Sequence, residues 1–168
     1  MRRSVLAAAL VLAAAAHAQP SQQQPAEPAA PLPLPALRLE GLVPLEVPRS
    51  VGVRWAIDPQ SLQVTPDGLV RYVVVGQSGS GALNVYYESL RCATNEVKVH
   101  ARRGRDGDWV RAGAGEDWRA MDGGAATRHS RAIANSGACF GPMANGSAAD
   151  IVRALRGAST GRYENQSR

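Results

Sequence analysis

The chain has 168 residues, of which 45% are hydrophobic and 20% charged, and its formal net charge at pH 7 is +5. The densest group of basic side chains is Lys98, Arg102, Arg103 and Arg105, and no Phe, Trp or Tyr lies among them. Proteins that bind single-stranded nucleic acids combine basic side chains with aromatic stacking platforms. The composition therefore argues against a nucleic-acid partner.

Residues 1–18 have the pattern of a secretory signal peptide. Arg2 and Arg3 precede an apolar stretch over residues 4–16, and small residues, Ala16 and Ala18, stand where a cleavage site requires them. The apolar stretch is shorter than the ~20 residues that span a bilayer. We therefore expect cleavage after Ala18 and an exported product in the periplasm, or secreted, without a transmembrane anchor.

The composition then divides the mature chain into three parts. Residues 19–36 are almost wholly Gln, Pro, Ala and Leu and include Pro-Leu-Pro-Leu-Pro, which predicts a disordered tether. Residues 37–157 have the size and patterning of a single domain. Residues 158–168 carry little that could be buried, and we expect them to be a frayed tail.

Alternating hydrophobic residues predict a series of strands within this domain. Thr-Pro-Asp-Gly at 65–68, Ser-Gly-Ser-Gly at 78–81 and Gly-Arg-Asp-Gly at 104–107 are typical of turns. Residues 112–146 lack the pattern and are predicted to be mostly loop. The expected strands are 51–57, 61–64, 69–75, 83–92, 95–103 and 109–110.

A helix is predicted near the end of the domain. Ser147 is a good N-cap with Asp150 three residues later, Ile151 and Leu155 share an apolar face, and Gly157 is a typical stop. Strands followed by a helix indicate the α+β class, here an antiparallel sheet of about five to six strands with one C-terminal helix.

The hairpin formed by residues 83–103 has a register that the pattern of faces favours. A tight turn at 93–94 brings opposite charges together and places the apolar residues of both strands on one face. Glu88 then lies on the core face, where it needs a donor such as Arg128 if it is buried. The predicted pairs are Arg91 with Glu96, Ser89 with Lys98, and Tyr87 with His100.

The same register produces an outward stripe of polar and aromatic side chains. We consider this stripe a candidate interaction surface, and an ordinary solvated sheet face is the alternative that stays open. Its members are Tyr87, Arg91, Glu96, Lys98 and His100.

Cys92 and Cys139 are the only cysteines of the chain. In an exported protein, two cysteines within one domain predict a disulfide more readily than a metal site or a nucleophile. This bridge would hold the weakly patterned segment before Cys139 against the sheet.

Several motifs resemble those of one protein family. They are Asn-Val-Tyr-Tyr-Glu-Ser-Leu-Arg-Cys at 84–92, Glu-Val-Lys-Val at 96–99, Gly-Asp-Trp at 107–109, and Trp118. Over about residues 50–157 the chain resembles the cryptic neisserial protein family, small exported bacterial proteins. The resemblance implies a similar fold and location and supplies no catalytic residue.

The residues for known chemistries are sparse. His100 and His129 are the only histidines after cleavage, and Ser78 and Ser80 lie in a glycine-rich turn rather than at a nucleophile elbow. No cofactor or metal site is indicated. We expect a non-catalytic binding or interaction module of the cell envelope whose partner is an unknown envelope protein or polymer; the alternatives are an enzyme acting on an envelope polymer and a small-molecule or metal binder.

Overall fold

A computed structural model describes residues 32–48, 50–113 and 115–165, with 160–165 described by their backbone alone. The predicted signal peptide and the first part of the predicted tether lie outside these residues. From Leu32 onward the chain forms one compact unit. Within the described ranges, no helical segment has the length and hydrophobicity that crossing a bilayer requires.

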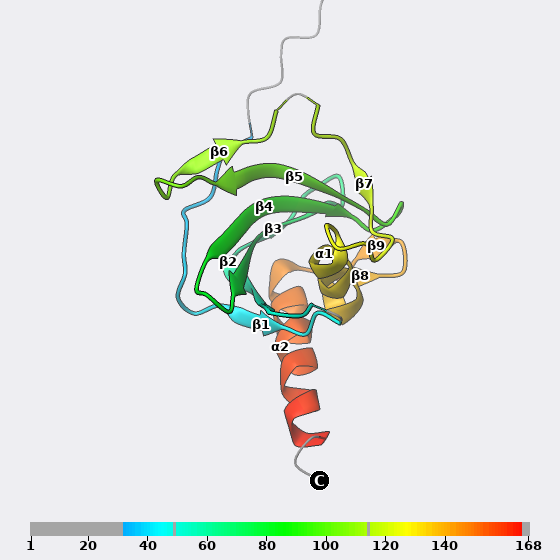
Figure 1. Ribbon diagram of the computed structural model, residues 1–168. Helices are drawn as coiled ribbons and strands as arrows, with labels where there is room; N and C mark the ends of the chain where they lie inside the picture. The colour runs from blue at the N-terminus through cyan, green and yellow to red at the C-terminus, as the bar shows by residue number, and fades with distance from the viewer. Residues whose placement is uncertain (1–31, 49, 114, 166–168) are drawn as a thin grey trace, which may run out of the picture. The chain divides into compact units, whose positions relative to one another are not determined.

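The unit is built on an antiparallel sheet that curls around two helices (Figure 1), which confirms the predicted α+β class. Each strand from β1 to β6 pairs with the next in chain order, and β7 pairs with β5. The strands are β1 (Val43–Leu45), β2 (Val53–Val64), β3 (Val70–Ser78), β4 (Leu83–Arg91), β5 (Glu96–Arg103), β6 (Trp109–Arg111) and β7 (Arg119–Ala120).

The two strands predicted at 51–57 and 61–64 are one strand, β2, with an irregularity between Asp58 and Gln63. Pro59 has no N–H to give to a sheet ladder, so a local break is expected there. The Ser61 hydroxyl accepts a 2.8 Å hydrogen bond from the Val73 N–H and thus keeps this backbone donor satisfied. The two halves of β2 therefore stay in one sheet.

The segment predicted to be mostly loop contains more structure than expected. Helix α1 (Arg128–Ile133) continues into the π-helical turn η1 (Ala134–Ala138), and a small hairpin of β8 (Cys139–Phe140) and β9 (Met143–Ala144) follows. Thr127, at the start of α1, makes no side-chain capping bond. A helix this short and uncapped leaves little trace in a sequence.

Helix α2 (Ala148–Asn165) begins as predicted but does not end at Gly157. Ser147 and Asp150 form the expected reciprocal cap, in which each side chain accepts a hydrogen bond from the other residue's backbone N–H. A single glycine costs a helix only about 1 kcal/mol, and the residues after Gly157 include no proline. The prediction of a frayed tail is therefore wrong for residues 158–165.

A cluster of buried side chains lies on each face of the sheet. On the concave face, Tyr72, Val74 and Leu90 pack against Ile133 of α1 and Leu155 of α2. A second cluster lies on the opposite, convex face and consists of Val73, Val75, Val85, Tyr87 and Ala101.

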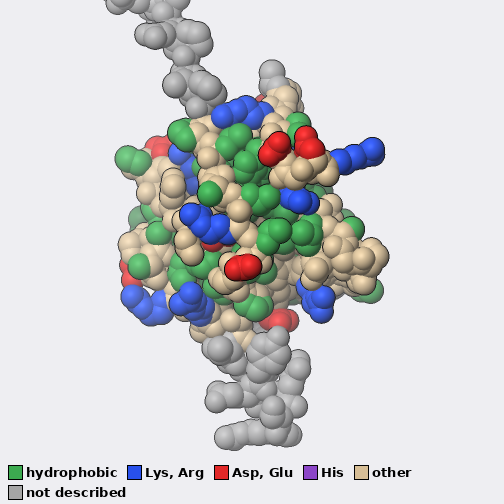
Figure 2. Space-filling model, turned by 90° about the vertical axis from the view of Figure 1, so that its left-hand side faces the viewer, with side chains coloured by type: hydrophobic (Ala, Val, Ile, Leu, Met, Phe, Trp, Pro, Cys, Tyr) green, Lys and Arg blue, Asp and Glu red, His purple; other side chains and the backbone are tan. Residues whose placement is uncertain are grey.

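The convex cluster is covered by residues 32–42, which we call the strap. Leu32, Leu34, Leu37 and Leu42 pack against the convex cluster. Figure 2 views the molecule from the side along which the strap runs and shows hydrophobic side chains interspersed with Lys and Arg. Residues 32–36, which were predicted to be part of the tether, therefore belong to the compact unit.

Candidate functional site

The predicted register of the β4–β5 hairpin is correct near its turn and shifts further along. Arg91 opposes Glu96 and Ser89 opposes Lys98, as expected. A bulge between Glu88 and Tyr87 then inserts His100 as an extra residue, so that Tyr87 opposes Ala101 instead. The predicted pairing of Tyr87 with His100 is wrong because the pattern of faces alone does not reveal a bulge.

Tyr87 does not belong to an outward stripe. Its side chain is 3% exposed and lies in the convex cluster, 5.5 Å from the His100 ring and 6.4 Å from the Trp109 ring. It is on the predicted face, but the strap and β6 cover that face. The other four members, Arg91, Glu96, Lys98 and His100, are half-buried beyond the part that the strap covers.

Cations gather on this uncovered part of the convex face. By register Arg71 and Lys98 flank Ser89 on either side, and within the described part of the chain neither has an ion pair. Burial, reinforced by the positive charges of Arg71 and Lys98, lowers the pKa of His100 to about 4. We call Arg71, Arg91 and Lys98 the cationic face.

Arg91 makes two contacts that fix the position of its guanidinium. It donates a 3.1 Å hydrogen bond to the Glu96 carboxylate, and its guanidinium lies 3.9 Å from the centre of a Trp118 ring. The contact with Trp118 is a cation–π interaction. Arg91 is therefore held in place at the border between the cationic face and the end of the hairpin.

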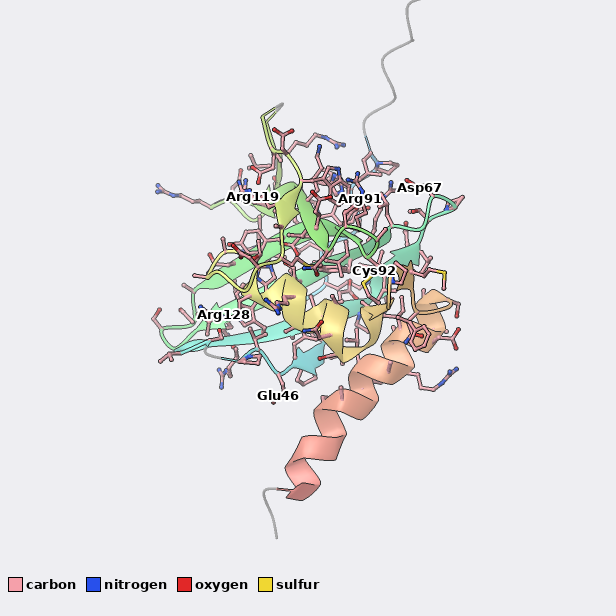
Figure 3. The ribbon with its side chains drawn as sticks, turned by 90° about the vertical axis from the view of Figure 1, so that its right-hand side faces the viewer. Glu46, Asp67, Arg91, Cys92, Arg119 and Arg128 are labelled. Atoms are coloured by element: carbon pink, nitrogen blue, oxygen red, sulfur yellow. A yellow bond between two sulfur atoms is a disulfide. The ribbon has the colours of Figure 1, made fainter. Side chains whose placement is uncertain are left out.

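A groove of about 520 Å³ lies at the same end of the sheet. Figure 3 shows Asp67, Arg91 and Cys92 at this end, next to the sulfur–sulfur bond. We call it the turn-end groove, because turns β2–β3 and β4–β5 form one side and the β8–β9 hairpin the other. Its lining includes Asp67, Leu69, Arg91, Ala93, Pro142 and Met143.

The β8–β9 hairpin exposes two large apolar side chains. Phe140 is 72% exposed and Met143, its partner across the hairpin, is 63% exposed. The Phe140 side chain is the only phenylalanine of the protein. The sequence interpretation missed this hairpin, although the Gly-Pro pair between Phe140 and Met143 is a turn signal that could have indicated it.

The predicted disulfide is confirmed. Cys92 follows β4, Cys139 begins β8, and the bond joins them across a Cα–Cα distance of 5.7 Å. It attaches the β8–β9 hairpin to the β4–β5 turn. The exposed pair and the turn-end groove are therefore covalently fixed relative to each other.

Glu88 lies on the concave face as predicted and is 1% exposed. One carboxylate oxygen accepts hydrogen bonds from the Tyr72 hydroxyl at 2.9 Å and the Ser130 hydroxyl at 3.1 Å, and the other lies 2.9 Å from His129 Nε2. Burial and the neighbouring Glu88 charge raise the pKa of Tyr72 well above its usual value. The raised pKa means that the Tyr72 hydroxyl keeps its proton, so it continues to donate a hydrogen bond to the Glu88 carboxylate.

The expected donor, Arg128, is replaced by the next two residues. Successive residues of a helix point about 100° apart, so His129 and Ser130 face the sheet while Arg128 lines a hollow of about 430 Å³ with Glu46 and Asp122. Figure 3 shows Arg128 and Glu46 on this outer side of α1.

The His129 ring packs against two aromatic rings. Its centre lies 4.2 Å from that of Trp55 and 5.7 Å from that of Tyr86, and the Trp55 and Tyr86 rings are themselves 6.4 Å apart. Since Nε2 bonds a carboxylate, it carries a proton, and Nδ1 is buried without a hydrogen-bond partner in the described part of the chain.

The buried network does not favour catalysis. Ser130 and His129 both bond Glu88 rather than each other, so the serine–histidine pair of a nucleophilic site is not formed, and the Glu88 carboxylate is shared among three donors. All four polar members are at most 4% exposed, which leaves a substrate no access. The arrangement is that of a satisfied buried carboxylate that fixes α1 on the sheet. Within the described ranges, His, Cys, Asp and Glu do not gather in threes that could hold a metal ion.

Comparison with known proteins gives one result. The sequence pattern of the CNP1-like family matches residues 21–156, which is most of the chain. No curated protein and no solved structure matches.

Proposed function

We propose that this chain, which belongs to the CNP1-like family, a family of unknown function, is an exported, non-catalytic interaction module of the bacterial cell envelope. The binding surface in this proposal is the turn-end groove together with Phe140 and the cationic face. The predicted stripe is thereby corrected: Tyr87 leaves it, and Arg71, Phe140 and Met143 join it.

The observation that carries the proposal is the exposure of Phe140 and Met143. Each large apolar side chain that stays in water forgoes about 1.5–3 kcal/mol of burial. Here two such side chains lie opposite each other on a hairpin that the disulfide holds in place. Exposed apolar patches rimmed by polar residues are typical of protein interaction sites, and Asp67 and Arg91 line the groove beside these side chains.

Electrostatics supports a partner that carries negative charge. Arg71 and Lys98 have no ion pair in the described part of the chain, whereas Glu96 on the same face is already bonded to Arg91. The uncompensated charge on this face is therefore positive. An acidic partner would gain in association rate and in specificity from it.

Site-specific photo-crosslinking in living cells tests the surface. A photoreactive phenylalanine analogue at Phe140 should capture a defined partner. The matched control is the same analogue at Val51, which is 92% exposed. The pairing of β2 with β3 puts residue 51 at the opposite end of the sheet from the turn-end groove.

Two outcomes decide the matter. Capture at position 140 that is lost when Arg71 and Lys98 are both changed to Glu supports the surface. Equal capture at positions 140 and 51, or none at either, contradicts it. Intact-mass analysis of the periplasmic fraction tests export separately, because processing after Ala18 gives a chain that begins at Gln19.

A further inference from the structure

The strap lies on the convex face in the manner of a bound peptide. The Trp109 indole N–H donates a 2.9 Å hydrogen bond to the Pro35 carbonyl, and Arg111 donates a 2.8 Å hydrogen bond to the Leu32 carbonyl. Both donors come from β6. Between these two carbonyls the strap has the sequence Leu-Pro-Leu-Pro.

The spacing of these contacts fits a proline-rich ligand. Residues 32 and 35 are three apart, and a polyproline II helix has three residues per turn, so their carbonyls point the same way. Such segments are bound by aromatic grooves whose donors reach backbone carbonyls, because proline itself offers no N–H. Tyr87 and Trp109, with rings 6.4 Å apart, supply the aromatic wall here.

An ion pair between the strap and the sheet adds a requirement for a basic residue in the ligand. Asp58 is 1% exposed, and one of its carboxylate oxygens has no hydrogen-bond partner in the described part of the chain. Arg38 of the strap lies 3.6 Å from that oxygen. Whatever occupies the place of the strap must therefore bring a cation three residues after the position of Pro35, since an uncompensated buried carboxylate is costly.

We propose that the part of the convex face beneath the strap is a receptor for Leu-Pro-rich segments followed by a basic residue, and that residues 32–38 occupy it in cis. The occupant in function is such a segment of another protein, which displaces the strap. The cis segment acts as an intramolecular competitor, and its own sequence defines the chemistry of the ligand. This site is separate from the turn-end groove, so the two proposals stand or fall independently.

The test uses the mature chain with its strap weakened. Changing Leu32, Leu34 and Leu37 to Ser removes the apolar anchors and leaves Arg38 beside Asp58. The probe is a fluorescein-labelled peptide with the sequence of residues 30–40, and its binding is measured by fluorescence anisotropy. The control peptide carries Glu in place of the arginine.

We expect the weakened variant to bind the probe at least tenfold more tightly than the unaltered protein, because a tethered segment competes at an effective concentration of about 1 mM. The control peptide should not bind. Trp109→Phe in the weakened background should weaken binding, since it keeps the ring and loses the donor. Equal binding by both proteins, or no binding by a folded weakened variant, overturns the proposal.

A second experiment tests the proposal even where the weakened variant does not fold. A protease site inserted at Gly41, which is exposed and has open space around it, allows the strap of an otherwise unaltered chain to be cut. The cut segment should then exchange with excess labelled probe, as native mass spectrometry can follow. A cut segment that never exchanges shows that the strap is a permanent part of the fold and overturns the proposal.

Discussion

Helices cover the concave face of the sheet, whereas an extended strap covers part of the convex face (Figure 1). A disulfide holds the helical side, and hydrogen bonds hold the strap. On the concave side the disulfide, a buried carboxylate and two helices all fix the same packing. On the convex side, leucines, two bonds to carbonyls and one long ion pair hold residues 32–38.

The difference between the two faces indicates where the molecule can open. Interactions that are buried and interconnected are lost together, and partly exposed contacts of an extended segment can be lost one at a time. We therefore expect the concave packing to determine global stability and the convex packing to determine local opening.

Removal of the disulfide should have the largest effect. The bridge closes a loop with a sequence separation of 47, and in the chain-entropy model such a loop is worth about 4 kcal/mol. Cys92→Ser together with Cys139→Ser should lower the melting temperature by about 15–30 °C, as differential scanning calorimetry can measure. A shift of only a few degrees would contradict the role assigned to the bridge.

Removal of the buried Glu88 carboxylate should give the second largest loss of stability. Glu88→Ala leaves the Tyr72, Ser130 and His129 donors without their acceptor, and we expect a loss of about 3 kcal/mol in the free energy of unfolding. Glu88→Gln keeps one acceptor oxygen and is the matched control, with a smaller loss. Chemical denaturation measures both, and equal losses would contradict this expectation, because the volume and the acceptor oxygen that Gln retains would then contribute nothing.

The convex face should show its own dependence on pH. The pKa of His100 is lowered from 6.5 to about 4 in the fold, so the unfolded chain binds this proton more readily and stability falls as pH drops from about 6.5 to 4. Partial exposure limits the effect to about 1–2 kcal/mol. In His100→Gln this part of the loss should disappear, and an unchanged pH profile of the melting temperature would contradict the assignment.

Removal of a single hydrogen bond to the strap should give the smallest loss of stability. Trp109→Phe removes the donor to the Pro35 carbonyl and should cost about 1 kcal/mol. If the strap opens locally, limited proteolysis should speed up within residues 32–42 and stay unchanged within β3. Faster cleavage on both faces would show instead that the two faces open as one unit.

Features determined by local sequence were predictable. The cap at Ser147 depends on residues that are neighbours in the chain, and the first pairs of the β4–β5 hairpin follow from its tight turn. The disulfide followed from the number of cysteines in a chain that we expect to be exported. Each of these inferences rests on local or compositional rules that tertiary contacts did not overturn.

Features that depend on distant contacts were not predictable. Tyr87 was placed on the right face, but only the strap, some fifty residues earlier in the chain, makes that face a buried one. The bulge at His100 moves one residue out of register without any glycine to indicate it. The sequence analysis named Arg128 as a donor to Glu88 and did not identify His129 or Ser130, because α1 was not predicted and without a helix the direction of each side chain is unknown.

The cross-link between Cys92 and Cys139 also makes the stability of this fold depend on its compartment. Where thiols stay reduced, the chain lacks about 4 kcal/mol of stabilisation, an amount comparable with the whole net stability of a marginal domain, about 5 kcal/mol. Chains in a reducing environment would then spend more time unfolded, which would favour passage through a narrow channel in the export that we propose. In that proposal, oxidation in the periplasm would complete the fold after the chain has crossed the membrane.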